Sequence, residues 1–202
     1  MMRSVPNDLV TLETERPVWE RCFTVAPLIV VGTREGEGWD LAPKHMATPL
    51  GWEGHFGFVC TPEHATYHNA REHGAFTVSF PRPGGVVVSS LAASPRCDDE
   101  GDQPVLDGIS TFPATDVDGP LLEDAYLWLE CRLDRIVDGF GDSSLVAGRV
   151  VTAHAREGTM RVTGGDDQER IHRHPLLAFV SPDRWAEIDE TSAFPFPEGF
   201  RR

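Results

Sequence analysis

Two short stretches of the chain combine a cation, hydroxyl groups and small side chains in a way that suits an anionic, flat ligand. Residues 42–48 read Ala-Pro-Lys-His-Met-Ala-Thr and include Lys44, the sole lysine of the chain. Residues 60–66 read Cys-Thr-Pro-Glu-His-Ala-Thr and join an expected strand to an expected helix. Helix N-termini carry free amide groups that bind anions, and small side chains let a planar ring approach the backbone. The combination suits a phosphate-bearing planar cofactor, but capped helices are common, so the spacing alone more often indicates a helix that is capped only for its own stability.

Other chemistries find less support in the sequence. No Gly-x-Ser-x-Gly motif is present, so a serine nucleophile is not expected. Residues 32–38 are rich in glycine but acidic, and no helix pattern follows them, which indicates a turn rather than a phosphate loop. The histidine pairs at 64/68 and 172/174 lack a third metal ligand at a recognised spacing, so no metal site is expected. The four cysteines form no Cys-x-x-Cys pair, and reduced thiols are expected.

The elements that would position the two stretches are mostly strands. Strands are predicted over residues 23–33, 55–60, 76–80, 126–136 and 144–155, with hairpin turns at 34–38 and 138–142. A helix is predicted over residues 62–73, with Thr61 as its N-cap, Pro62 at its first position and Gly74 in the left-handed conformation after its end. A short helix is predicted over 86–93. Many strands with few helices favour a closed barrel.

Length and charge narrow the class of protein further. The 202 residues, 40% hydrophobic and 25% charged, fit one soluble domain over 1–202. The net charge of −14 opposes binding to nucleic acid or to an anionic membrane. Residues 98–124 hold nine acids and neither Lys nor Arg, and we expect them to form a solvated acidic excursion. The apolar run at 26–31 is far too short for a membrane helix, and a cytoplasmic location is expected.

The C-terminal segment, residues 190–202, is rich in proline and phenylalanine. Its prolines lack amide donors, so it can form neither a regular helix nor a central strand. An exposed tail with three phenylalanines would be costly, so we expect it to pack against its own domain or against a partner subunit.

Four regions resemble the flavin reductase-like family of FMN-binding split barrels. They are residues 26–33, residues 41–50, residues 58–80, and the pair 129–133 and 147–151. The resemblance implies a mainly β (α+β) fold, a six-stranded antiparallel Greek-key split β-barrel with flanking helices. It also implies a homodimer that binds FMN between the barrel and the neighbouring subunit. Many members carry Ser or Thr where this chain has residues 43–46, and Asp-Pro-Pro where it has residues 51–54.

The resemblance implies an FMN-binding oxidoreductase that takes a hydride from NADH or NADPH and passes electrons to free flavin, a partner oxygenase or another electron acceptor. The candidate cofactor-binding residues are Ala42, Pro43, Lys44, His45, Met46, Ala47, Thr48, Cys60, Thr61, Pro62, His64, Ala65 and Thr66. Lys44 would neutralise either the phosphate or the N1 side of reduced flavin, and His45 or His64 is a candidate for assisting a proton transfer. No residue is assigned as catalytic. Two alternatives stay open: a non-catalytic, flavoredoxin-like electron carrier, and a cofactor-free interaction protein.

Overall fold

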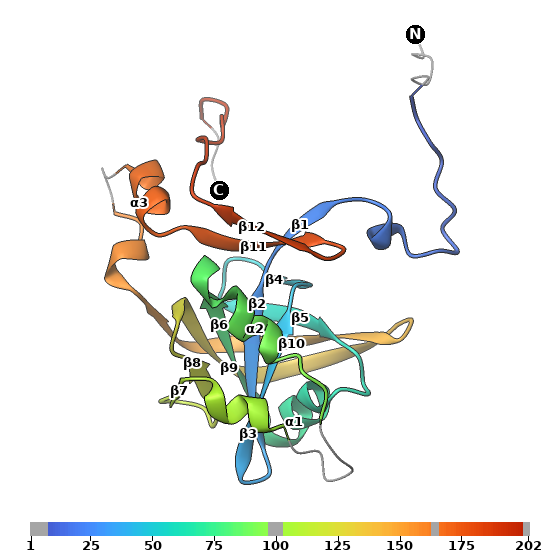
Figure 1. Cartoon of the computed structure of the whole chain (residues 1–202), viewed down its shortest axis with the longest axis vertical. Coiled ribbons are helices and arrows are strands. Elements are labelled where there is room, and N and C mark those ends of the chain that lie inside the picture. The colour runs from blue at the N-terminus through green and yellow to red at the C-terminus, as the bar shows by residue number, and fades with distance from the viewer. Residues whose placement is uncertain (1–7, 97–102, 163–165, 200–202) are drawn as a thin grey trace.

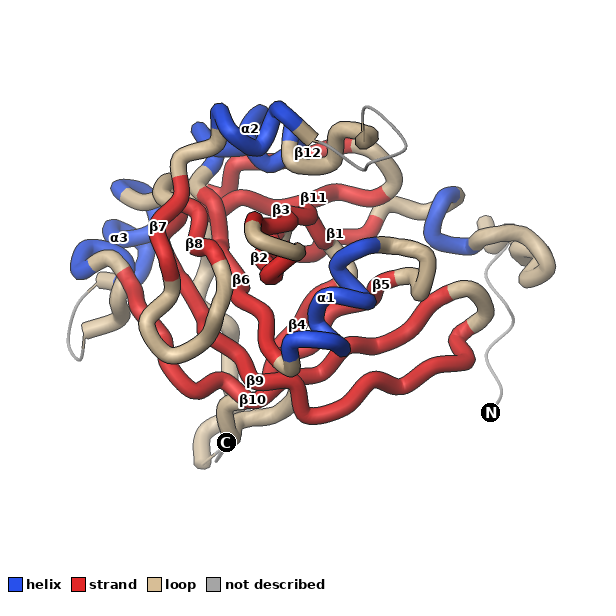
Figure 2. Tube along the Cα trace, turned by 90° about the horizontal axis from the view of Figure 1, so that it is seen from below, coloured by secondary structure: helices blue, strands red, loops and turns tan. Residues whose placement is uncertain are grey.

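The computed structural model describes residues 8–96, 103–162 and 166–199 (Figure 1). Its centre is an antiparallel sheet of seven strands in the order β3-β2-β6-β9-β10-β5-β4. Their bounds are β2 (Ile29–Glu35), β3 (Gly38–Lys44), β4 (Ala47–Pro49), β5 (His55–Cys60), β6 (Ala75–Pro81), β9 (Ala125–Phe140) and β10 (Ser143–Ala155). The sheet curls into a half-barrel, which Figure 2 views from below. The predicted fold class, a mainly β split barrel with flanking helices, is confirmed, and its main sheet has seven strands because the short β4 joins the edge.

Two smaller sheets and three α-helices complete the described structure. A three-stranded sheet has the order β1-β11-β12, and β7 pairs with β8 in a separate ribbon. These strands are β1 (Thr24–Pro27), β7 (Thr111–Pro113), β8 (Pro120–Leu122), β11 (Leu176–Ser181) and β12 (Arg184–Ile188). The helices are α1 (Ala65–His73), α2 (Val86–Leu91) and α3 (Asp167–Arg173). Within the described ranges, none of the helices is long and apolar enough to cross a membrane.

The hydrophobic core follows the alternation of side chains along β2. Ile29 and Val31 are fully buried in the cluster inside the curl, together with the ring pair Phe58–Phe76. Val30 points to the opposite face, where it joins a second cluster with residues from α2 and the β7–β8 region. Because adjacent side chains on a strand face opposite sides, one apolar run supplies both clusters. β2 is therefore buried on both faces.

The predicted strand over 23–33 is two strands in the structure. β1 pairs with β11, whereas β2 pairs with β3 and β6, so the chain changes sheets at Leu28. Pro27 ends β1 and has no amide hydrogen to donate, which limits how far one hydrogen-bonded ladder can continue. The predicted hairpin around residues 34–38 is confirmed as the tight β2–β3 turn, in which Gly36 has a φ of 53°.

The long hairpin near the middle of the chain is also confirmed, with longer strands than predicted. β9 continues to Phe140 and β10 begins at Ser143, so the turn is shorter than residues 138–142. Gly139 and Gly141 both have positive φ values, 98° and 63°, which glycine adopts without strain. These two glycines let the hydrogen-bonded ladder of β9 and β10 extend into residues 138–142, which the sequence predicts to be a turn.

The described part of the acidic excursion keeps its acids at the surface, as predicted, whereas apolar residues between them pack into the fold. Ile109, Leu121 and Leu122 are buried. Thr115, Asp116 and Val117 donate backbone hydrogen bonds to the buried carboxylate of Glu130 on β9. The apolar residues between the acids and the hydrogen bonds to Glu130 hold the segment against the fold while its acids face the solvent. Residues 98–102 lie outside the described residues.

The two described phenylalanines of the aromatic tail keep much of their ring surface exposed. Phe194 is 71% exposed and Phe196 is 43% exposed, and the two rings contact each other at a centroid distance of 4.5 Å. Packing of these rings against their own domain or against a partner subunit stays a prediction. Phe200 lies outside the described residues.

Candidate functional site

Parts of the two predicted stretches meet at a pocket of about 320 Å³ between β3 and the start of α1. We call it the β3–α1 pocket. One wall is the end of β3, and a second is the turn that leads into α1. A third is segment 92–96, which follows α2. The predicted residues that line it are Ala42, Pro43, Lys44, His64, Ala65 and Thr66.

The rest of the first stretch faces two neighbouring hollows. His45 lines a hollow of about 290 Å³ with Phe179 and Trp185, which we call the Trp185 hollow. Residues 45–48 line another of about 460 Å³ with Trp19, which we call the Met46 hollow. Pro43 is shared by the β3–α1 pocket and the Trp185 hollow, and His45 by the Trp185 and Met46 hollows. The first stretch therefore connects three adjoining depressions.

The beginning of the second stretch lies outside these walls. Cys60, Thr61 and Pro62 line none of the three depressions. Cys60 is buried in the core, where burial raises the pKa of its thiol while the nearby Lys44 ammonium acts in the opposite direction. Thr61 carries the one buried side-chain oxygen in the described structure that has no hydrogen-bond partner.

The predicted helix start is wrong. α1 begins at Ala65, its N-cap is His64, and no side chain caps it. The amide of His64 donates to the carbonyl of Thr61 at 3.1 Å, so residues 61–64 form a separate turn before the helix. The predicted end is confirmed, because Gly74 has a left-handed φ of 64° and its amide donates to the carbonyl of Ala70. The later start places the first turn of α1 on the wall of the pocket.

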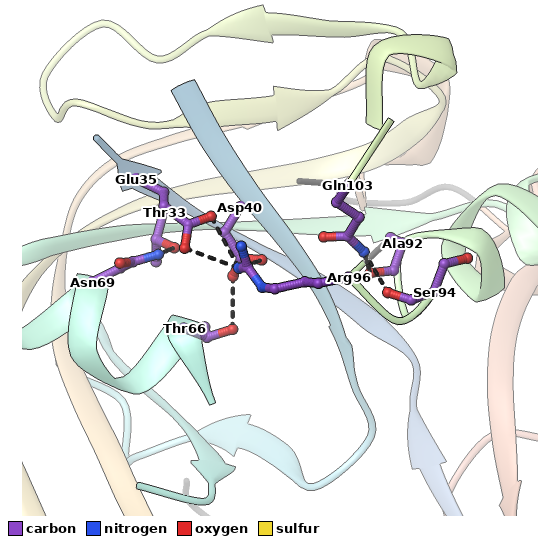
Figure 3. Close-up of polar contacts among 9 residues, drawn as sticks. All are labelled: Thr33, Glu35, Asp40, Thr66, Asn69, Ala92, Ser94, Arg96 and Gln103. Atoms are coloured by element: carbon purple, nitrogen blue, oxygen red, sulfur yellow. Dashed lines mark hydrogen bonds and ion pairs between the residues drawn. The ribbon is translucent and has the colours of Figure 1, made fainter. Parts of the chain in front are cut away.

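A polar network lies in the wall of the β3–α1 pocket, where Asp40, Thr66 and Arg96 are lining residues (Figure 3). The hydroxyl of Thr66 donates to Oδ2 of Asp40 at 2.9 Å, and the amide of Asn69 donates to the hydroxyl of Thr33 at 3.2 Å. Arg96 reaches Oδ1 of Asp40 at 3.6 Å. Burial raises the pKa of the Asp40 carboxyl, and the Thr66 hydrogen bond opposes this rise. The network ties α1 to β2 and β3.

His45 is held in a stacked position at the junction of the Trp185 and Met46 hollows. Its ring lies 4.2 Å from that of Phe179, with an angle of 23° between the planes. Burial lowers the pKa of the imidazole, and the positive charge of Lys44 acts in the same direction. Both effects favour the neutral form of the imidazole. A neutral, stacked imidazole is suited to contact a flat ring.

The residues of the β3–α1 pocket fit the phosphate end of a planar cofactor. Lys44 supplies a positive charge. The first turn of α1 has no side-chain cap, and its residues Ala65 and Thr66 line the wall, whereas the amide of Tyr67 donates to the carbonyl of His64. Ala42, Pro43 and Ala65 leave room for a flat group. In the described part of the chain, no group of three or more His, Cys, Asp or Glu side chains is placed to hold a metal ion.

The third wall of the pocket was not predicted from the sequence. It consists of residues 92–96 and the side chain of Gln103. Arg96 and Glu35 are separated by 61 residues, so neither strand nor helix periodicity connects them. The sequence signal for this contact is weak: Arg96 lies two residues before an acidic run that the sequence places in solvent.

The curled antiparallel sheet with flanking helices defines a protein of the split-barrel class. A family model described as flavin reductase like domain matches residues 21–175. The chain belongs to the flavin reductase-like family, as its sequence motifs predicted. Among curated proteins, none matches this sequence significantly.

Solved structures share the fold at low sequence identity. Nitrilotriacetate monooxygenase component B from Bacillus cereus has a TM-score of 0.78 at 17% identity, covering 94% of this chain and 100% of that one. Flavoredoxin from Methanosarcina acetivorans has a TM-score of 0.75 at 16% identity, with coverages of 95% and 97%. An FMN-binding protein from Thermus thermophilus has a TM-score of 0.70 at 22% identity, with coverages of 95% and 99%. These similarities establish the architecture of the chain.

Proposed function

We propose that the protein is an FMN-binding oxidoreductase that takes a hydride from NADH or NADPH and passes the electrons to an acceptor. The observation that carries the proposal is the β3–α1 pocket, where Lys44 and the uncapped start of α1 meet small side chains. Membership of the flavin reductase-like family and the FMN-binding neighbour from Thermus thermophilus support the same cofactor. When bound, FMN supplies the hydride-accepting and electron-carrying chemistry.

The residues of the pocket have separate tasks in this proposal. The Lys44 ammonium and the amides of the first turn of α1 bind the phosphate. Ala42 and Pro43 border the flat part of the ligand, and His45 contacts it from the adjoining Trp185 hollow. Hydride transfer depends on alignment more than on a protein acid or base, which agrees with a neutral His45. Cys60, Thr61 and Pro62 act through the turn that sets the position of α1.

We also propose that the protein works as a homodimer with the cofactor near the subunit boundary. The Met46 hollow lies next to several exposed apolar side chains, including Trp19 at 61% and Met46 at 49% exposure. Exposed apolar groups that gather around a depression are typical of an interaction surface. Because Pro43 and His45 link this hollow to the β3–α1 pocket, a second subunit seated there would enclose the cofactor.

The electron acceptor is proposed to be free flavin, a partner oxygenase or another small acceptor. The neighbour from Bacillus cereus is a component of a monooxygenase, which supports an oxygenase partner. The neighbour from Methanosarcina acetivorans is a flavoredoxin, which supports a second candidate, an electron carrier without its own reductase turnover.

The first experiment is to purify the protein without added cofactor, record its visible spectrum and identify any released chromophore. Titration with FMN then gives the affinity, and steady-state oxidation of NADH and NADPH with added FMN tests the reductase. Turnover supports the reductase, whereas bound FMN without turnover supports the electron carrier. A colourless protein that does not bind added FMN would overturn both.

A further inference from the structure

We infer that Arg96 is a positioning residue, which clamps segment 92–96 onto β2 and β3 as the third wall of the β3–α1 pocket. The inference rests on the proposed function, because it assigns a role in the binding of the same cofactor. Arg96 lies outside the two predicted stretches and outside the predicted start of the helix. Its basis is a set of ion pairs and hydrogen bonds that join three separate elements.

The first contact of the clamp is the ion pair between Arg96 and Glu35. Nη2 of Arg96 lies 2.9 Å from Oε1 and 3.0 Å from Oε2 of Glu35, at the end of β2. The two side chains are about one-third exposed, at 34% and 32%. Figure 3 shows Arg96 reaching from the segment after α2 toward the acids on the β2–β3 hairpin. The pair therefore anchors the wall to the hairpin.

The second contact connects the wall to α1. The same Nη2 lies 3.6 Å from Oδ1 of Asp40, whose side chain is 7% exposed. The other carboxylate oxygen of Asp40 accepts the hydroxyl hydrogen bond of Thr66 in the first turn of α1. Asp40, which also lines the pocket, thus joins its two walls. Without Arg96, the neighbouring carboxylates of Asp40 and Glu35 would repel each other.

A third contact holds the backbone of the wall itself. Nε2 of Gln103 donates to the carbonyl of Ser94 at 2.7 Å and lies 3.4 Å from the carbonyl of Ala92. Gln103 also lines the β3–α1 pocket. Gln103 therefore holds the backbone of segment 92–96, and the ion pairs of Arg96 hold the end of the same segment.

The charges indicate that Arg96 positions the wall and does not act as the main phosphate ligand. Its guanidinium lies beside the carboxylates of Glu35 and Asp40, whereas Lys44 reaches the thiol of Cys60 and forms no ion pair with a carboxylate among the described residues. Arg96 also lines a separate hollow with Glu35 and Trp39, so its side chain forms a partition between that hollow and the β3–α1 pocket. Lys44 is left to meet the ligand phosphate.

The two roles predict opposite effects when Glu35 is neutralised. If Arg96 is a clamp, Glu35→Gln loosens the wall and weakens FMN binding. If Arg96 is a direct phosphate ligand, Glu35→Gln releases its charge toward the phosphate and tightens FMN binding. A double-mutant cycle with Arg96→Gln measures the coupling, because coupled residues give non-additive effects.

The experiment uses the full chain and measures its FMN dissociation constant by flavin fluorescence quenching, together with the hydrogen exchange of segment 86–96. We expect Arg96→Gln and Glu35→Gln each to raise the FMN dissociation constant about fivefold to tenfold. The double variant is expected to bind FMN no more weakly than the more impaired of the two single variants. Arg96→Lys is expected to restore part of the affinity. Hydrogen exchange in segment 86–96 is expected to accelerate while the thermal midpoint changes little.

Arg82→Gln is the matched control, because Arg82 pairs with Asp124 beside a different hollow. Its FMN affinity is expected to stay within about twofold of the wild type. Tighter FMN binding by Glu35→Gln, or unchanged affinity and exchange in Arg96→Gln, would overturn the clamp. If the wild-type chain binds no FMN, the proposed function fails, and the exchange of segment 86–96 in the variants still decides whether the clamp exists.

Discussion

Lys44 is the residue on which the phosphate-binding assignment depends most directly. It lines the β3–α1 pocket beside the uncapped first turn of α1. We predict that Lys44→Ala weakens FMN binding by about 1.5–3 kcal/mol, the usual contribution of a charge-assisted hydrogen bond. Isothermal titration with FMN and with riboflavin measures the effect. Riboflavin lacks the phosphate, so its affinity is expected to change little.

Lys44→Arg is the control for the Lys44 prediction, because it keeps the positive charge and is expected to retain most of the affinity. An equal loss for FMN and riboflavin in Lys44→Ala would place the ammonium near the ring instead of the phosphate. Unchanged affinity for both ligands would show that Lys44 does not bind the cofactor.

Glu130 is a buried carboxylate whose contribution to the free energy of unfolding is expected to depend on pH. Burial alone would raise the pKa of Glu130, but hydrogen bonds from the backbone amides of Asp116, Thr115 and Val117 and from the Thr115 hydroxyl lower it below 4.5. A group with a lowered folded-state pKa stabilises the protein above its unfolded value, and this contribution is lost as the pH falls through the folded value. The stabilisation by Glu130 is therefore complete at neutral pH and declines below about pH 4.5.

We predict that Glu130→Gln lowers the free energy of unfolding at pH 7 by about 1.5–3 kcal/mol, because hydrogen bonds to a charged acceptor are lost. Urea denaturation of both proteins between pH 3 and pH 7 tests this. The difference between wild type and variant should shrink as the pH drops below about 4.5. A difference that stays constant over this range would contradict the assigned role of the ionised carboxylate.

At the scale of the elements, the β9–β10 ladder depends on the absence of a side chain at Gly148. A Cβ there would lie 2.6 Å from the buried ring of Phe76 and 3.0 Å from the carbonyl of Arg132. We predict that Gly148→Ala destabilises the protein by about 1–3 kcal/mol through overpacking of the core. Chemical denaturation measures it. Gly84→Ala is the control, because a Cβ at Gly84 would meet nothing within 4 Å; an equal effect of the two substitutions would contradict the packing argument.

Elements with strong local signals were predictable from the sequence. The β2–β3 hairpin, the β9–β10 hairpin and the end of α1 at Gly74 depend on nearby turn residues and on alternating side chains. The start of α1 was misplaced because Thr61 and Pro62 form a typical cap pattern, whereas the structure uses residues 61–64 as a separate turn. A cap pattern indicates that a helix begins nearby, and tertiary contacts determine which residue is its first.

The candidate site was predictable only where short stretches carry it. Lys44 and Thr66 were found because each lies in a compact pattern beside a strand or helix end. The contact between Arg96 and Glu35 connects distant segments, and such pairs leave no periodic trace in the sequence. The division of residues 42–48 between three depressions likewise follows from the curl of the sheet, which local spacing does not determine.

At the scale of the whole molecule, the three adjoining depressions and their exposed apolar rim predict a link between dimerisation and cofactor binding. Met46→Glu places a charge in the Met46 hollow and is expected to shift the protein to monomer and to raise the FMN dissociation constant. Sedimentation velocity and FMN titration at matched concentrations measure both. Val162→Glu is the control, because Val162 is 50% exposed and lines none of the three depressions. Monomeric Met46→Glu protein with full FMN affinity would show that one subunit suffices for the site, and a wild-type monomer would disprove the proposed dimer.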